Sequence, residues 1–132
     1  MLTNSHEPVI LVIEGDQSRR NVVCEALHRA GFAVVAASTG AQALATVESR
    51  RVSLVLAGSH LRGLSGAEVL LKLRDREARH QLSPVPFMML PDDLDLSAGT
   101  RVRCLAWPVT VGELVSTVSE MLNRQRALQP LP

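Results

Sequence analysis

Short apolar runs alternate with amphipathic stretches along the whole chain. Val9–Ile13 is a continuous run of valine, isoleucine and leucine, which is typical of a strand buried on both faces. The stretch after it repeats apolar residues at helical spacing, with Asp16 as the expected N-cap and Gly31 closing the helix. In all, the apolar runs predict five strands, at residues 9–13, 32–37, 52–57, 87–90 and 102–106.

Three capping boxes mark predicted helix starts, because in each of them a glutamine or glutamate can reach back to the amide of the N-cap residue. They are Thr39–Gln42, Ser65–Glu68 and Thr110–Glu113. The segment from Pro91 to Thr100 differs: it has few apolar residues and contains a glycine, so we expect fewer than about two helical turns there. The alternation of strands and helices predicts a doubly wound α/β domain, a parallel sheet with helices on both faces.

The length and the ends of the chain indicate one domain. At 132 residues the chain is expected to bury a sufficient core without disulfides or metals. We expect a polar N-terminal tail at residues 1–7, the domain at 8–124 and a short C-terminal tail at 125–132. The N-terminus lacks the apolar core of a signal peptide, and no apolar run approaches the roughly 20 residues that span a bilayer. These features predict a cytoplasmic protein without membrane contact.

The charge and the aromatic content argue against direct nucleic-acid binding. The formal net charge is +1, and the chain has two phenylalanines, one tryptophan and no tyrosine, so both an electrostatic footprint and a stacking surface are missing. The basic run 74–79 alternates with acidic residues, and with Arg50–Arg51 it is interpreted as solvated helix ends. Cys24 and Cys104 form no metal-ligand pattern, and Asp92, Asp93 and Asp95 are typical of a solvated loop. We therefore expect no metal and no cofactor.

The stretch from Leu54 to Gly66 combines an apolar strand, a loop with Gly63 and the start of a helix. Together with Trp107–Thr110 and the order of the elements, it resembles the receiver domains of bacterial response regulators, over about residues 8 to 124. The resemblance implies the flavodoxin-like strand order 2-1-3-4-5. It also implies a role in two-component signalling, and a fourth helix that is short or missing here, since the segment from Pro91 to Trp107 is shorter than usual for the family.

The phosphorylation chemistry of that family is absent from the matching positions. The residue that accepts the phosphoryl group, an aspartate in the family, is replaced by a glycine without a side chain. Of the two acids that hold Mg²⁺ one remains, and a single carboxylate is a poor site for this ion. The hydroxyl, the lysine and the switch aromatic of the family are also replaced. The resemblance places the phosphate-accepting residue at Gly58 and the two Mg²⁺-holding acids at Glu14 and Gly15. It places the hydroxyl at Pro91, the lysine at Trp107 and the switch aromatic at Cys104.

We therefore expect a pseudo-receiver, a non-enzymatic and phosphorylation-independent module that acts through protein–protein interaction or dimerisation. The expected partner is a histidine kinase, an output domain or a second copy of the chain. Candidate contact residues are Trp107, Pro108, Val109 and Cys104. Trp107 either fills the hollow left by the lost side chains or anchors a partner, since tryptophan is enriched in interface hot spots. Two alternatives stay open: the emptied pocket senses a small ligand, or the protein is phosphorylated unconventionally, for example on Ser59 or His60.

Overall fold

The computed structural model describes residues 7–58, 61–92 and 102–128. Strands and helices alternate from the start of this region to its end, as the hydrophobic pattern predicts. The elements in chain order are β1 (Val9–Ile13), α1 (Gln17–Arg29), β2 (Ala33–Ala37), α2 (Gly40–Ser49), β3 (Leu54–Gly58), α3 (Gly66–Arg79), β4 (Phe87–Leu90), β5 (Arg103–Cys104) and α4 (Val111–Leu128).

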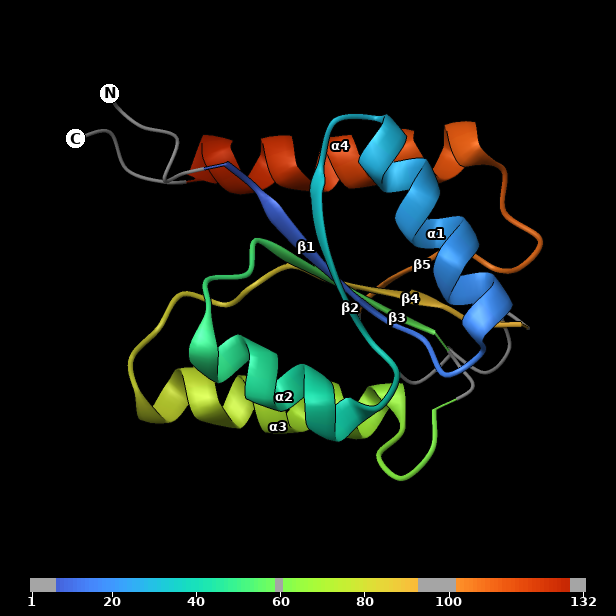
Figure 1. The fold of residues 1–132 in the computed structure, drawn as a ribbon. Helices are drawn as coiled ribbons and strands as arrows, with labels where there is room; N and C mark the ends of the chain where they lie inside the picture. Colours follow the sequence, from blue (N-terminus) through green and yellow to red (C-terminus); the bar gives the residue numbers. More distant parts are fainter. Residues whose placement is uncertain (1–6, 59–60, 93–101, 129–132) are drawn as a thin grey trace.

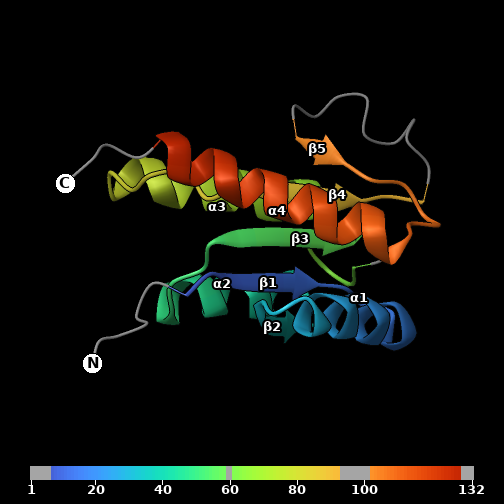
Figure 2. The same cartoon turned by 90° about the horizontal axis from the view of Figure 1, so that it is seen from above.

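The strands form a single five-stranded sheet in the order β2-β1-β3-β4-β5, visible from above in Figure 2. Every neighbouring pair is parallel. In the central pairs, Ile10 of β1 lies between Val34 of β2 and Leu54 of β3. The flavodoxin-like order implied by the family resemblance is confirmed.

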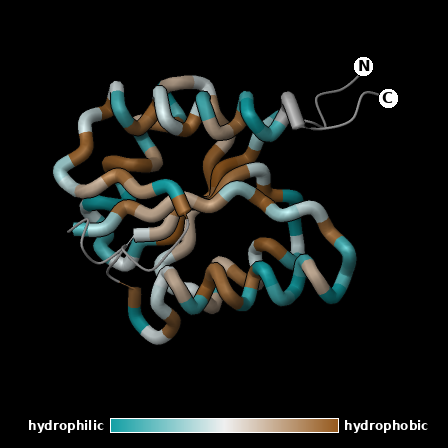
Figure 3. Tube along the Cα trace, turned by 180° about the vertical axis from the view of Figure 1, so that it is seen from behind, coloured by the Kyte–Doolittle hydropathy of each residue, from teal (hydrophilic) through white to brown (hydrophobic). Residues whose placement is uncertain are grey.

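Helices cover both faces of the sheet, α1 and α4 on one face and α2 and α3 on the other (Figure 1). Successive residues of a strand point to opposite faces, so β1 contributes to two cores. Ile10 and Val12 pack with the residues of α1 and α4, whereas Leu11 and Ile13 pack with those of α2 and α3. Figure 3 shows the resulting concentration of hydrophobic residues along the strands, between the helical layers.

The helix starts follow the local sequence signals, with one correction. Asp16 caps α1 by accepting a hydrogen bond from the Ser18 N–H, and the predicted boxes at Ser65–Glu68 and Thr110–Glu113 form both of their hydrogen bonds. At α2 the Thr39 hydroxyl oxygen accepts from the Gln42 N–H, as expected. The predicted return bond to the Thr39 amide is wrong, because the Gln42 side chain accepts from the Ser38 N–H and hydroxyl instead.

Several predicted element boundaries are also corrected. The second strand begins one residue later than predicted, the third runs from Leu54 to Gly58, and the fifth has only two residues, at the edge of the sheet beside the short β4. The last helix continues to Leu128, past the predicted domain boundary at 124. The predicted fourth-helix segment falls mostly on residues 93–101, which lie outside the described residues, as do Ser59 and His60. Within the described ranges, no helix is both long enough and apolar enough to cross a membrane.

Candidate functional site

The carboxyl ends of the parallel strands meet at one edge of the sheet, where open α/β sheets usually bind their ligands. Four of the residues singled out in the sequence lie there. Glu14 directly follows β1, Gly58 ends β3, Pro91 follows β4, and Trp107 lies shortly after β5. The topology therefore brings the degenerate positions together, although they span 93 positions of the chain.

The Glu14 carboxylate occupies the space that a side chain at position 58 would need. Glu14 is only 2 % exposed. A Cβ atom built onto Gly58 would lie 2.0 Å from Glu14 Oε1 and 2.7 Å from its carboxyl carbon. No side chain can start at position 58 while Glu14 holds this conformation. A carboxylate is thus present at the end of β3, but it comes from the neighbouring strand β1.

The turn into α1 holds Glu14 in place. Its Oε2 accepts a hydrogen bond from the Asp16 N–H at 2.9 Å, and its backbone carbonyl accepts one from Arg20 Nη1 at 2.8 Å. Its Oε1 is buried and has no hydrogen-bond partner. A buried carboxylate oxygen without a partner among the described residues is costly, so this atom is an unsatisfied polar group at the edge.

The residues at this edge do not fit the Mg²⁺ ion of the receiver family. Mg²⁺ requires near-octahedral oxygen ligands and usually more than one anionic group. Glu14 is a single carboxylate with one oxygen already bonded, Gly15 and Gly58 supply none, and Asp16 is turned to the cap of α1. Across the described part of the chain, no group of three or more His, Cys, Asp or Glu side chains is arranged to hold a metal.

Trp107 packs against the core on the α1 and α4 side of the sheet. Its side chain is partly buried beside that cluster, together with Leu105 and Val109. Its backbone N–H donates to the Pro91 carbonyl at 3.0 Å, which ties the segment after β5 to the end of β4. The indole Nε1–H is buried and has no acceptor among the described residues. The bulk of the tryptophan is therefore used in packing, while its polar atom is left unpaired.

Arg19 is a residue of this site that the sequence reasoning missed. Its guanidinium carbon lies 4.7 Å from the centroid of the Trp107 ring, a cation–π arrangement. Its Nη1 also forms an ion pair with Asp92 Oδ1 at 2.5 Å. The only available signal was its place in the first turn of a helix that starts at this edge. Nothing in the sequence indicated which ring or carboxylate it would meet.

The other candidate contact residues divide by exposure. Pro108 is exposed, Val109 is half-buried in the same cluster as Trp107, and Cys104 is half-buried in β5, where it pairs with Met89 of β4. The Cys104 thiol lies 3.6 Å from the Val102 carbonyl oxygen, to which it can donate. Of this group, Pro108 is the one that is freely accessible.

Comparison with known proteins agrees with the fold. A family model described as the response regulator receiver domain matches residues 10–98. A receiver domain protein from Clostridium thermocellum superposes with a TM-score of 0.78 at 22 % identity, over 92 % of this chain and 99 % of that one. The chemotaxis response regulator CheY4 of Vibrio cholerae gives a TM-score of 0.74 at 21 % identity, over 86 % and 98 % of the two chains.

Curated relatives are longer than this chain. The CAI-1 autoinducer sensor kinase/phosphatase CqsS of Vibrio cholerae is 31 % identical over 61 % of the chain and 12 % of its own length. The sensory transduction protein RegX3 of Mycolicibacterium smegmatis is 26 % identical over 87 % of the chain and 50 % of its own length. The chain thus spans half or less of these two relatives. Since the family match covers well over half of the 132 residues, the chain belongs to the response regulator receiver domain family.

Proposed function

We propose that this receiver domain signals without being phosphorylated, as a pseudo-receiver that acts through protein–protein contact. Receiver domains are modules of two-component signalling that interact with histidine kinases and output domains. The observation that carries the proposal is the Glu14 carboxylate in the volume of the missing side chain at position 58. The phosphoacceptor position is not an empty pocket that awaits a substitute; it is filled.

The remaining positions support the same conclusion. Phosphoryl transfer requires an accepting nucleophile, together with metal ions and fixed positive charge that neutralise the charge of the phosphoryl group. Gly58 has no nucleophile, and Pro91 has neither a hydroxyl nor an N–H group to offer. The two arginines at this edge are already engaged: Arg19 is stacked on Trp107 and paired with Asp92, and Arg20 donates to the Glu14 backbone carbonyl. We therefore propose no catalytic step for this domain.

The proposed contact surface lies beside Trp107. Pro108 is exposed there, and Val111 at the start of α4 is 58 % exposed although it is a large apolar residue. Trp107 is partly buried next to this surface and packs against the core. The partner would be a histidine kinase, an output domain or a second copy of the chain.

The test of phosphorylation independence is intact-protein mass spectrometry after incubation with acetyl phosphate and Mg²⁺. We expect no phosphoryl adduct on the natural protein. We also expect none on Gly58→Asp, because Glu14 obstructs the new side chain and the metal and phosphate ligands are still missing. A hydroxylamine-labile adduct on the natural protein would refute the proposal, and the receiver domain of RegX3, tested in parallel, shows whether the conditions suit a receiver.

One observation favours a second candidate, a ligand-sensing domain. Both buried side-chain atoms that lack a hydrogen-bond partner in the described residues, Glu14 Oε1 and Trp107 Nε1, belong to residues at this edge. One is an acceptor and the other a donor, as the polar groups of a small-molecule site would be. A small molecule that co-purifies with the natural protein and is lost from Glu14→Ala would favour this candidate. Protein freed of small molecules that still binds its partner would favour the pseudo-receiver.

A further inference from the structure

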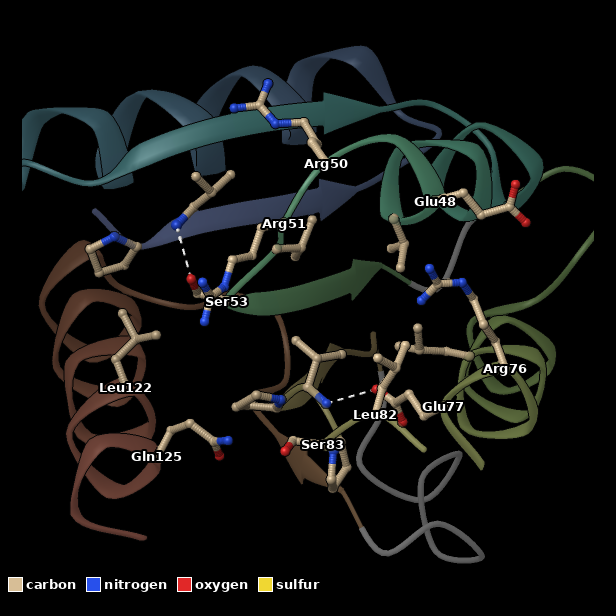
Figure 4. Close-up of a pocket in the computed structure, with 18 of the residues that line it drawn as sticks. Glu48, Arg50, Arg51, Ser53, Arg76, Glu77, Leu82, Ser83, Leu122 and Gln125 are labelled. Carbon is tan, nitrogen blue, oxygen red and sulfur yellow. Dashed lines mark hydrogen bonds between the residues drawn. The ribbon is translucent and has the colours of Figure 1, made fainter. Parts of the chain in front are cut away.

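The opposite edge of the sheet carries a broad open groove of about 1170 Å³. It lies where the strands begin, since the residues before β1, β3 and β4 line it, together with the ends of α2, α3 and α4 (Figure 4). It is therefore separated from Glu14 and Trp107 by the length of the strands. Pockets for small ligands usually measure about 300 to 1000 Å³ and enclose most of the ligand, so an open groove of this size suits an extended segment better.

Three arginines line this groove without a carboxylate partner. Arg50 and Arg51 are exposed in the connection from α2 to β3, and Arg76 is half-buried on α3. In the described part of the chain none of the three forms an ion pair, whereas Arg74 on the same helix is paired with Glu77. Arginine binds carboxylates with a planar, two-pronged donor geometry. The groove thus offers unused positive charge in a form that suits carboxylates.

A hydroxyl donor and an apolar anchor lie between these charges. Ser53 Oγ accepts a hydrogen bond from the Val9 N–H at 3.2 Å and donates to no described residue, so its proton is available. Leu82 is 45 % exposed at the rim. Glu77 adds no uncompensated negative charge to the groove, because one of its oxygens is paired with Arg74 and the other accepts from the Val85 N–H.

The balance of charge decides between a polypeptide and a nucleic acid. Two exposed carboxylates, Glu7 and Glu48, also line the groove, against its three free arginines. Figure 4 shows the Glu48 carboxylate directed away from Arg51 and Ser53. A mixed rim of this kind lacks the clustered positive charge through which a phosphate backbone is recognised. It accommodates a segment that alternates acidic and apolar side chains.

We propose that this groove is a docking site for an acidic, extended polypeptide segment of a partner protein. Carboxylates of the segment pair with Arg51 and Arg76, and an apolar side chain packs on Leu82. The site is independent of the degenerate edge, so a partner would be held there whatever the state of Glu14 or Trp107.

The test is an NMR titration of ¹⁵N-labelled protein with a nine-residue probe peptide that repeats Glu-Glu-Leu and spans about 30 Å when extended. We expect saturable shifts confined to residues 47–53 and 76–86. Arg51→Glu/Arg76→Glu should weaken binding at least about tenfold, because it removes two charge-assisted contacts of arginine with carboxylates of the peptide. The matched control Arg29→Glu/Arg79→Glu makes the same change of net charge at exposed arginines that already have partners, Glu25 and Asp75. It should weaken binding less than about threefold, the scale of general screening.

A further variant and further probes distinguish the proposal from its alternatives. Arg51→Gln/Arg76→Gln repeats the loss without introducing repulsion, and the dispersion of its spectrum reports whether it is folded. A peptide with Gln-Gln-Leu repeats should not bind. Equal weakening by the control variant, shifts at the Trp107 edge, or equal binding of inorganic phosphate or a single-stranded oligonucleotide would each overturn the proposal.

Discussion

At the scale of single residues, the main feature of the site is that the Glu14 side chain occupies the volume that a side chain at position 58 would need. The carboxylate at the end of β1 reaches across to the end of β3 and takes the place of a side chain there. The glycine therefore does more than leave position 58 without a side chain. It is the residue that lets a longer acid lie buried at position 14, and the two positions should be coupled energetically.

A double-mutant cycle tests this coupling. Gly58→Ala should lower the free energy of unfolding by about 1–3 kcal/mol, the usual cost of overpacking, because its Cβ meets Glu14 Oε1 at 2.0 Å. In a Glu14→Ala background the same change should cost at least about 1 kcal/mol less. Urea unfolding followed by circular dichroism measures both. Gly66→Ala is the control, since a Cβ there meets its nearest atoms at an ordinary 3.6 Å. Equal costs in the two backgrounds would show that Glu14 simply moves aside.

Trp107 is the second residue with an unpaired buried polar atom. Its variants distinguish the contribution of its ring volume from that of its indole N–H. Trp107→Ala should cost about 3 kcal/mol of stability, as truncations of buried aromatics do. Trp107→Phe should cost less than about 1.5 kcal/mol, because it keeps most of the ring volume and removes a buried N–H that lacks an acceptor. Both are measured by urea unfolding with far-ultraviolet detection, because the tryptophan signal is lost. A phenylalanine as harmful as alanine would mean that the indole N–H has a partner in solution.

At the scale of elements, the helix starts are the best explained features. Each capping residue satisfies backbone N–H groups that have no partner inside the helix. At α3 the Ser65 N–H donates to the Glu68 carboxylate and the Ser65 hydroxyl oxygen accepts from the Glu68 N–H, and the hydrogen bonding at Ser65, that of its backbone N–H above all, holds the pKa of Glu68 below its ordinary value. A carboxyl group with a lowered pKa in the folded state stabilises the fold only while it is ionised.

The capping box therefore predicts a pH dependence. Glu68→Gln should reduce stability at pH 7, and the difference from the natural protein should shrink as the pH falls below the unfolded value of about 4.3 and through the lowered folded value. Unfolding free energies of both proteins at about pH 7 and pH 3 give the comparison. Glu48→Gln, at an exposed glutamate with no hydrogen bond or ion pair in the described structure, should show no such trend. A constant difference for Glu68→Gln would contradict the role of its ionised form.

The ion pair and ring contact of Arg19 belong to the same scale. They connect the start of α1 to the ends of β4 and β5. These three elements thus meet around an arginine and a tryptophan. The contact is partly exposed, so its contribution to stability is modest, about 1 kcal/mol or less.

At the scale of the whole molecule, the sheet is most protected at its centre. β1 and β3 pair with strands on both sides, and their residues from Ile10 to Ile13 and from Leu54 to Ala57 are almost completely buried. β5 has two residues and one neighbour. Hydrogen exchange followed by NMR should therefore find the slowest amides in β1 and β3 and distinctly faster ones in β5. Equal protection of β5 would indicate that a further segment of chain covers that edge.

The two edges of the sheet also have separate proposed roles. The carboxyl edge carries Glu14 in the volume beside Gly58, and the amino edge carries the arginine groove. Variants of Glu14 and of Arg51 should therefore act independently on partner binding, as expected for sites without shared neighbours.

Much of this protein can be deduced from local patterns. The apolar runs of β1 and β4 predicted those strands to the residue, and the boxes at Ser65 and Thr110 predicted the starts of α3 and α4, because both signals depend on residues close in sequence. That position 58 offers no side chain was also readable, since a glycine has none in any fold. Strand ends were less certain, because β3 and β5 end where their pairing ends, and pairing depends on neighbours distant in sequence.

Only the tertiary structure decided which side chains meet at the carboxyl ends of the strands. Glu14 and Gly58 are 44 positions apart, and Arg19 and Trp107 are 88 apart. No local pattern reports that the first pair competes for one volume or that the second pair stacks. The same holds for the groove: the sequence pattern indicates solvated arginines, and the fold places Arg51 and Arg76 at one opening without an ion-pair partner among the described residues. The sequence determines which groups the chain possesses, and packing determines which of them meet, because contact depends on distances that only the folded chain defines.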